Sequence, residues 1–312
     1  MPFWLEILVG FAALVVGADF LVRGASKIAK GFGVPPFVIG LTLVAYGTSA
    51  PEFAVSATAA IRGVGAFSLG NAFGSNVANI GLVLGLSALI RPIEVEGTVV
   101  KREAPLLIGV ALLFPLFFLD GVLARWEGLL AVAGGIAFTV WSLKTARRRE
   151  NAPEKIKLGP GVWLLSIGFC GAGIAGLLYG ADWLISGSKE LARILGMSER
   201  VIGLTVVAVG TSLPELATSV MAMIRGHSDI AVGNVIGSNI FNLLFALGGA
   251  VSLAPISLAG MGYGIWVDAG VGLLLALLLL PFARSGKIIA RWEGAVFLAV
   301  YAGFVTYLVL AG

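Results

Sequence analysis

The chain has almost no cysteine and histidine, two residue types from which soluble catalytic and metal sites are often built. Its 312 residues include one cysteine, Cys170, and one histidine, His227. A single cysteine excludes an internal disulfide bond and a metal site made of several thiolates. A single histidine likewise excludes a multi-histidine metal site and disfavours a histidine proton relay. Charged residues make up only 12% of the chain, about half of their share in soluble globular proteins.

Long hydrophobic runs take the place of the missing charge. Hydrophobic residues make up 58% of the chain, and runs of roughly 20 apolar residues, the length that crosses a bilayer, recur from end to end. The sequence therefore predicts an all-α polytopic membrane protein embedded in lipid. The ten expected transmembrane helices are 3–22, 37–61, 68–90, 104–119, 126–143, 161–184, 201–224, 230–250, 263–283 and 292–310. The longest hydrophilic stretch, 144–160, is too short to form a soluble domain.

The two halves of the chain repeat each other. The segment 17–93 superimposes on 180–256 without a gap, and 12 of 15 positions are identical between 38–52 and 201–215. The end of the first span recurs in the second half, where 179–187 resembles 16–24, so we interpret that span as a helix and not as a cleavable signal peptide. Each half holds five spans, an odd number, so the second half must enter the membrane with opposite orientation. Inverted repeats of this kind build secondary transporters.

This repeat divides the chain into 1–143, a basic linker at 144–160, and 161–312. If the N-terminus and C-terminus lie outside the cell, 16 of the 21 basic residues fall on the cytoplasmic side. The positive-inside rule favours that orientation in the cell membrane, with the linker in the cytoplasm. The net charge of +4 is therefore interpreted as a topology signal, and no binding of nucleic acid is expected.

Two carboxylates interrupt the apolar runs, and they occupy equivalent positions in the two halves. Glu52 lies in GTSAPE (47–52) and Glu215 in GTSLPE (210–215). A charged residue at the centre of a transmembrane helix costs about 2.5–3.5 kcal/mol even on a lenient scale. No lysine or arginine lies at the middle of an expected span, so an internal salt bridge has no donor, and protonation is the remaining way to neutralise the pair. Two such carboxylates indicate a cation-binding site.

The residues beside these glutamates can supply neutral oxygen. Pro51 and Pro214 cannot donate to the carbonyls of Gly47 and Gly210, and each proline ring pushes that carbonyl aside. We therefore expect a broken helix, which is tolerated at membrane depth where it lines a cavity. The hydroxyl groups next to the break belong to Thr48, Ser49, Thr211 and Ser212.

A second repeated motif, GNxxGSNxxN, starts at Gly70 and at Gly233. Its glycines predict close helix packing, while serine and asparagine four residues apart share one helix face. The expected ion ligands from this motif are Ser75, Asn79, Ser238 and Asn242. Asn71 and Asn234 lie one turn before these serines, and for Asn76 and Asn239 a structural role and a binding role are equally compatible with the sequence.

The resulting ligand set contains only oxygen, which suits hard cations such as Ca²⁺ and Na⁺. One Ca²⁺ balances the charge of two glutamates, and several Na⁺ ions can use the same carboxylates together with hydroxyls and carbonyls. A site that holds either Ca²⁺ or Na⁺, but not both fully, provides a physical basis for antiport. No resident cofactor is expected.

The two GTSxPE motifs, each followed by GNxxGSNxxN, resemble the two α-repeats of the Ca²⁺/cation antiporter superfamily, and especially the compact prokaryotic Na⁺/Ca²⁺ exchangers. The resemblance implies alternating access, with the first and sixth spans sliding across the rest. It implies that Glu52 and Glu215 are shared by Ca²⁺ and Na⁺. The other implied ion ligands are Thr48 and Thr211 for Ca²⁺, Ser49, Ser212, Ser75, Ser238 and the carbonyls of Ala45 and Ala208 for Na⁺, and Asn79 and Asn242 in the middle of the site. Many members have aspartate at the position of Asn242, so asparagine there weakens the case for K⁺ co-transport. We expect no counterpart of the large cytoplasmic regulatory domain of animal exchangers.

Three other functions compete with Na⁺/Ca²⁺ exchange. A Ca²⁺/H⁺ antiporter of the same superfamily would use both glutamates to exchange protons, and a passive cation channel would use the same ligands without coupling. An intramembrane hydrolase would use Ser49 or Ser212 as nucleophile, but the only histidine lies in a loop. We set aside Asp19, for which an ion pair with Arg23 is expected, and its repeat equivalent Asp182; His227 is expected to be solvated.

Overall fold

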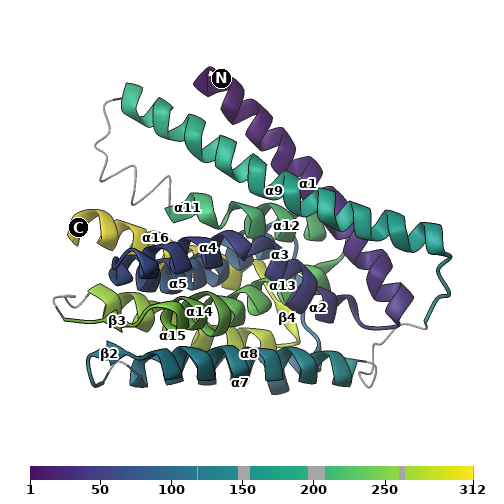
Figure 1. Cartoon of the computed structure of the whole chain (residues 1–312). Helices are drawn as coiled ribbons and strands as arrows, with labels where there is room; N and C mark the ends of the chain where they lie inside the picture. The colour runs from purple at the N-terminus through teal and green to yellow at the C-terminus, as the bar shows by residue number, and fades with distance from the viewer. Residues whose placement is uncertain (118, 147–154, 196–207, 260–263, 312) are drawn as a thin grey trace.

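The computed structural model describes residues 1–117, 119–146, 155–195, 208–259 and 264–311, almost all of them helical. Most of the expected linker at 144–160 and the beginning of the expected span at 201–224 lie outside the described residues. Figure 1 shows α1 (Phe3–Phe32) and α9 (Pro160–Ile194) laid across one face of the other helices, with α7 (Ala104–Leu116) and α8 (Arg125–Ala146) on the opposite face.

Helices were expected in ten regions, and each region contains helix. The other elements, in chain order, are α2 (Pro36–Ile39), η1 (Gly40–Val44), α3 (Ala45–Thr48), α4 (Ala50–Ile61), α5 (Gly65–Ala78), η2 (Asn79–Leu84), α6 (Gly85–Ile90), η3 (Val99–Glu103), α11 (Ala208–Thr211), α12 (Leu213–Ile224), α13 (Ser228–Phe241), η5 (Asn242–Leu247), α14 (Gly248–Leu253), α15 (Gly264–Arg284) and α16 (Arg291–Ala311). Within the described ranges, seven helical stretches are long and apolar enough to cross a membrane, and an eighth is added if the bent pair 36–48 and 50–61 forms one span. The chain is thus a multi-pass helical membrane protein.

The helices α1 and α9 are longer than the sequence predicted. The expected span 3–22 is part of a helix of 30 residues, and 161–184 is part of a helix of 35 residues. Hydropathy marks only the apolar part of each helix, and both continue into more polar sequence. The two helices pack closely because glycines face each other: a Cβ atom on Gly17 would lie 2.9 Å from the carbonyl oxygen of Gly173.

The most buried helical stretches are 65–90 and 228–253, which carry the two GNxxGSNxxN motifs. In each stretch an α-helix changes to a π-helix at the last asparagine of the motif, Asn79 or Asn242. A π-helical turn inside an α-helix frequently marks a functional site. The sequence did not predict these turns.

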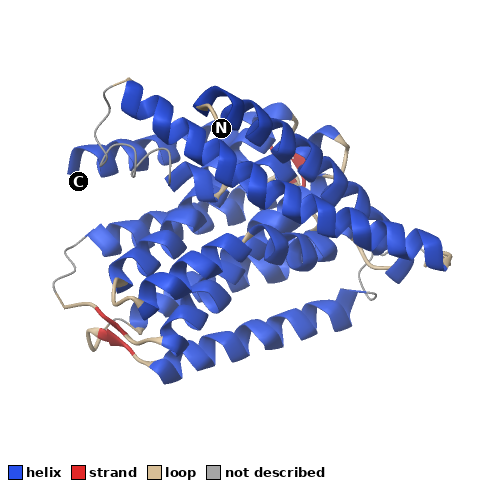
Figure 2. Ribbon diagram, turned by 45° about the horizontal axis from the view of Figure 1, so that its top comes forward, coloured by secondary structure: helices blue, strands red, loops and turns tan. Residues whose placement is uncertain are grey.

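Two short antiparallel strand pairs join the loops at opposite ends of the helices (Figure 2). β1 (Ile93–Glu94) pairs with β4 (Ile288–Ile289), and β2 (Val122–Leu123) pairs with β3 (Ile256–Ser257). The expected topology places the loops of each pair on one side of the membrane, so the strand pairing agrees with it.

Two other buried glutamates have a structural explanation. Glu127 accepts a hydrogen bond from the backbone N–H of Ala124 over 2.8 Å, and Glu293 accepts one from Ala290 over 2.7 Å. Each carboxylate thus satisfies a free N–H group at the beginning of its helix, α8 or α16. Burial of a carboxylate alone is therefore not a sign of ion binding in this protein.

Candidate ion-binding site

The helix breaks that the prolines predict are present in both halves. Ser49 separates α3 from α4 with φ −90° and ψ 10°, and Ser212 separates α11 from α12 with φ −91° and ψ 8°. The first break bends the helix by 46°. Neither serine side chain caps the helix that follows, so both hydroxyls are free to contact groups elsewhere.

Glu52 and Glu215 lie in the first turn of α4 and α12, at exposures of 1% and 0%. A helix N-terminus carries partial positive charge, which favours a carboxylate in the first turn. The two carboxylates are close enough to interact electrostatically. The structure therefore brings together two glutamates that lie far apart in the sequence, at equivalent positions of the two halves.

The side chain of one serine in the first half contacts a glutamate in the second half. The Ser49 hydroxyl donates a hydrogen bond to Glu215 Oε1 over 2.7 Å. Glu215 Oε2 and both carboxylate oxygens of Glu52 are buried and find no hydrogen-bond partner among the described residues, and the same is true of Ser212 Oγ. A buried polar atom without a partner carries a desolvation cost of about 1–3 kcal/mol, which protonation of the carboxylates or a bound cation would reduce.

Asn71 and Asn234 hold the backbone of the two glutamates. Asn71 Nδ2 donates to the carbonyl oxygen of Glu52 over 3.1 Å and to Ser56 Oγ over 2.9 Å. Asn234 makes the equivalent contacts with the carbonyl oxygen of Glu215 over 3.4 Å and with Ser219 Oγ over 3.0 Å. No role for these asparagines could be predicted from the motif alone, although their partners also occupy equivalent positions of the repeat.

Thr48 and Ala45 lie at the same break. Thr48 Oγ1 donates to Asn234 Oδ1 over 3.2 Å and approaches the carbonyl oxygen of Ala45 at 3.3 Å. That carbonyl also accepts the N–H of Ser49 over 2.9 Å. Thr48 thus forms a second contact between the halves, and the Ala45 oxygen accepts the N–H of Ser49 and lies within reach of the Thr48 hydroxyl, whose one proton is shared with Asn234 Oδ1 as an alternative acceptor. In the second half, the backbone of Ala208 begins α11.

The asparagines of the second motif divide into supporting and open groups. Asn76 Nδ2 donates to the carbonyl oxygen of Asn239 over 3.2 Å, and Asn242 Nδ2 donates to Asn76 Oδ1 over 3.2 Å. Asn76 therefore joins α5 to α13 and fixes the Asn242 amide. Asn242 Oδ1 and both polar atoms of Asn79 find no partner within the described ranges, so they remain able to bind a ligand.

The remaining expected ligands line the same interior. Ser75 and Ser238 are buried, at 4% and 0% exposure. Ser75 also lines a cavity of about 280 Å³ together with Asn71 and Thr211. The twelve residues expected to bind ions thus lie on helices that meet around the two breaks.

The electrostatics of this interior favour a cation. No lysine or arginine of the described chain is buried, so the two glutamates have no cationic side chain beside them. No group of three or more histidine, cysteine, aspartate or glutamate residues that could hold a metal occurs in the described residues. A cation here would therefore rely on two carboxylates supplemented by hydroxyl, amide and carbonyl oxygens, a set that hard cations accept.

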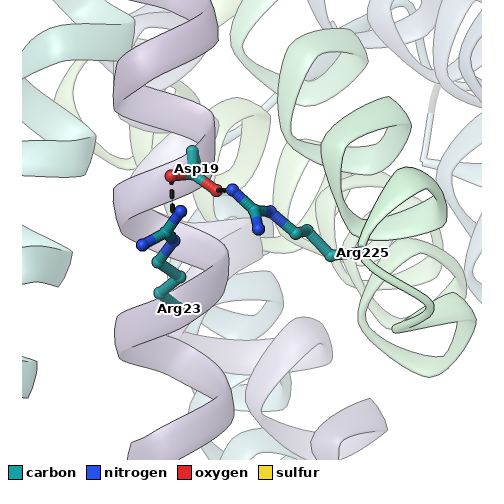
Figure 3. Close-up of polar contacts among 3 residues, drawn as sticks. All are labelled: Asp19, Arg23 and Arg225. Atoms are coloured by element: carbon teal, nitrogen blue, oxygen red, sulfur yellow. Dashed lines mark ion pairs between the residues drawn. The ribbon is translucent and has the colours of Figure 1, made fainter.

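The residues set aside from the sequence lie apart from this interior. Asp19 forms the expected ion pair with Arg23 over 2.9 Å and a second one with Arg225 over 2.5 Å (Figure 3). The expectation for His227 was wrong: its side chain is half-buried beside the positive charge of Lys30, and burial together with that charge lowers the pKa of its imidazole.

Residues 3–144 and 165–310 match the family described as sodium/calcium exchanger protein. The chain is 43% identical to the putative antiporter CaxA of Alkalimonas amylolytica over 96% of both chains. It is 36% identical to the sodium/calcium exchanger MaX1 of Methanosarcina acetivorans over 98% of both chains.

Among solved structures, the sodium–calcium exchanger NCX_Mj soaked with Na⁺ and Sr²⁺ aligns with a TM-score of 0.86 at 35% identity, covering 98% of this chain and 99% of that one. The family model covers both halves, including both helix breaks and both asparagine motifs. Its members are transporters and not enzymes, which removes the intramembrane hydrolase from consideration. The chain belongs to the sodium/calcium exchanger family.

Proposed function

We propose that this protein is a secondary antiporter that exchanges Na⁺ for Ca²⁺ across the cell membrane. The observation that carries the proposal is the pair Glu52 and Glu215, buried at two equivalent helix breaks and joined across the halves by Ser49. Three of their four carboxylate oxygens have no hydrogen-bond partner in the described structure. A Ca²⁺ ion between them would balance both charges.

The same oxygens can serve Na⁺ in place of Ca²⁺. Each glutamate has neutral oxygens beside it, from Ser49 and Thr48 in one half and from Ser212 and Thr211 in the other. Two or more Na⁺ ions would share the glutamates with these groups and with Ser75 and Ser238. Because both ions need the carboxylates, binding of one displaces the other, and this competition couples their movements.

The proposed architecture consists of ten transmembrane helices in two inverted halves, 1–143 and 161–312. Three observations support it: the repeat of 17–93 in 180–256, the five helical regions in each half, and the matching geometry at Ser49 and Ser212. The distribution of lysine and arginine supports an N-terminus and a C-terminus outside the cell and a cytoplasmic linker. Transport by alternating access would then expose one central site to each side in turn.

The experiment is ⁴⁵Ca²⁺ uptake into proteoliposomes that contain the full chain, loaded with Na⁺ and diluted into Na⁺-free buffer, with a protonophore present. We expect uptake that depends on internal Na⁺ and is lost in Glu52→Gln. In a second arm, without the protonophore and with an imposed pH gradient, uptake that requires this gradient and ignores Na⁺ would establish Ca²⁺/H⁺ antiport instead. Uptake that proceeds equally without internal Na⁺ would establish a passive channel.

A further inference from the structure

An ion pair fastens α1 to the end of α12. Arg225, the residue after α12, contacts Asp19 Oδ1 over 2.5 Å, while Arg23 contacts Asp19 Oδ2 over 2.9 Å (Figure 3). The Asp19 side chain is 15% exposed, so it lies between the two helices. Of the two arginines, only Arg225 belongs to a different helical element, so its contact alone resists movement of α1 relative to α12.

The same two residue types occur at equivalent positions of the other half. The repeat relates Asp19 to Asp182 on α9 and relates Arg225 to Arg62, the residue after α4. Asp182 and Arg62 are both exposed, and neither forms an ion pair with any described residue. The ion pair between Asp19 and Arg225 is therefore formed, whereas its equivalent between Asp182 and Arg62 is not.

The helix surfaces beside the two pairs differ in the same way. Ala54, Val55 and Thr58 on α4 line a shallow surface depression of about 440 Å³ together with Arg62. The equivalent residues on α12, which include the fully buried Thr218 and the half-buried Met221, are covered. The helix α1 packs along α12, whereas α9 has hardly any contact with α4. Among the described residues, the side that carries Arg225 is closed, and the side that carries Arg62 is open.

The helices α1 and α9 would move together. Their contact is the most extensive between any two elements of the described chain. Glycines at 10 and 17 of α1 lie so close to the α9 backbone that an added Cβ would approach within 2.6–2.8 Å of it. A shift of this pair that separates Asp19 from Arg225 would therefore carry Asp182 along.

We propose that Asp19–Arg225 and Asp182–Arg62 form a reciprocal latch, in which each ion pair holds one of the two end states of transport. This proposal rests on the proposed function, because the latch requires that each of the two inverted halves adopts in turn the conformation that the other half has in the opposite state. In the state described here, Asp19–Arg225 closes one side. In the opposite state, α1 and α9 have moved, Asp19–Arg225 is broken, and Asp182–Arg62 closes the other side.

Arg23 makes the latch on α1 reversible. It lies on the same helix as Asp19 and keeps its contact when α1 moves, so Asp19 is not left without a partner when Arg225 separates. The equivalent of Arg23 on α9 is Ser186. Asp182 has no such arginine, and it is exposed to solvent in the open state.

The test compares the accessibility of two equivalent positions with single-cysteine reporters. In a Cys170→Ala background, Thr58→Cys reports the open side and Met221→Cys reports the closed side. Each is labelled with a maleimide in the detergent-solubilised full chain, without any ion gradient. We expect Arg225→Gln to raise the rate of labelling at Met221→Cys about fivefold and to lower it at Thr58→Cys, since an ion pair of about 1 kcal/mol shifts a two-state equilibrium by that factor.

Three further variants complete the test. Asp19→Asn should match Arg225→Gln, and the double variant should go no further than either single one, because both remove the same contact. Arg62→Gln, the matched control, should leave Met221→Cys no more reactive than in the parent. The proposal is overturned if Arg225→Gln changes neither reporter, or if Arg62→Gln exposes Met221→Cys as Arg225→Gln does. Failure of Na⁺-driven Ca²⁺ uptake by the unmodified chain would overturn the proposed function alone, since labelling requires no transported ion.

Discussion

The Ser49 hydroxyl lies 2.7 Å from Glu215 Oε1 and donates a hydrogen bond to it, although the two residues belong to different halves of the chain. The equivalent pair would join Ser212 to Glu52, yet both of those side chains lack hydrogen-bond partners in the described structure. Two halves with nearly the same sequence thus build a site that is asymmetric in this conformation. The ends of α4 and α12 show the same kind of asymmetry, since Arg225 after α12 forms an ion pair with Asp19 and Arg62 after α4 forms none with its equivalent partner, Asp182.

Replacement of either central glutamate should abolish exchange. Glu52→Gln and Glu215→Gln keep the shape of the side chain but remove one of the two charges that would balance Ca²⁺. Loss of one member of a buried charge pair costs about 2–5 kcal/mol, so we expect Ca²⁺ affinity to fall by about 30-fold or more in each variant. Na⁺-driven ⁴⁵Ca²⁺ uptake and Ca²⁺ titration of the purified protein measure the two effects.

Glu293→Gln is the matched control for these variants. Glu293 is also buried, but its carboxylate accepts the N–H of Ala290 at the beginning of α16. Glutamine can accept the same hydrogen bond, so uptake should remain close to that of the unmodified chain. Equal loss of uptake in Glu293→Gln would show that the assay responds to any change of a buried glutamate.

The composition and the repeat were sufficient to predict the helical membrane fold and the equivalent positions of Glu52 and Glu215 inside it. The broken helices followed from Pro51 and Pro214, because a proline beyond the first turn of a helix cannot donate the helical hydrogen bond and its ring displaces the carbonyl four residues before it. The roles of Asn71 and Asn234 could not be deduced in the same way. Their hydrogen bonds join two helices, and the relative placement of those helices depends on tertiary packing. A sequence pattern predicts only which residues share one face of a single helix.

Asn71→Asp should damage the protein although it hardly changes the shape of the side chain. Both hydrogen bonds of Asn71 are donated by Nδ2, to the carbonyl oxygen of Glu52 and to Ser56 Oγ. A carboxylate cannot donate to the carbonyl oxygen and would place a third negative charge near the glutamates. We expect a loss of about 1–3 kcal/mol in stability, measured by thermal unfolding in detergent, and a matching loss in Asn71→Ala.

Asn76→Asp provides a comparison within the same helix. Asn76 also donates from Nδ2, but its acceptor is the carbonyl oxygen of Asn239 and its own oxygen accepts from Asn242. The stability of Asn76→Asp should also fall, but in this variant the carbonyl oxygen of Glu52 keeps its hydrogen bond from Asn71. If Asn71→Asp proves as stable as the unmodified chain, the hydrogen bonds to Glu52 and Ser56 do not support the site.

Stability should decrease at mildly acid pH because of His227. Burial and the charge of Lys30 lower the pKa of this histidine in the folded protein, so the unfolded chain binds a proton more readily. Its contribution to stability is therefore present above the unfolded pKa of about 6.5 and is lost as pH falls through that value towards the folded pKa. The half-buried position of the side chain makes this contribution small.

His227→Gln should flatten this part of the pH profile. The measurement is the Tm of both proteins in detergent between about pH 7.5 and pH 5.5, the range around the unfolded pKa. We expect the Tm of the unmodified chain to fall more steeply than that of the variant. Parallel curves would mean that His227 has the same pKa in the folded and unfolded states.

The two serines at the helix breaks should behave differently when no ion is bound. Ser49→Ala removes the donor to Glu215 Oε1 and leaves that buried oxygen without a partner, whereas Ser212→Ala removes a hydroxyl that has none among the described residues. The first variant should lose about 1–3 kcal/mol of stability in the ion-free state, and the second should lose much less. Thermal unfolding in the presence of a chelator and without Na⁺ tests this difference, and both variants should bind Na⁺ more weakly because each removes a proposed ligand. Equal stability of the two ion-free variants would show that the Ser49 hydrogen bond does not hold Glu215 in place.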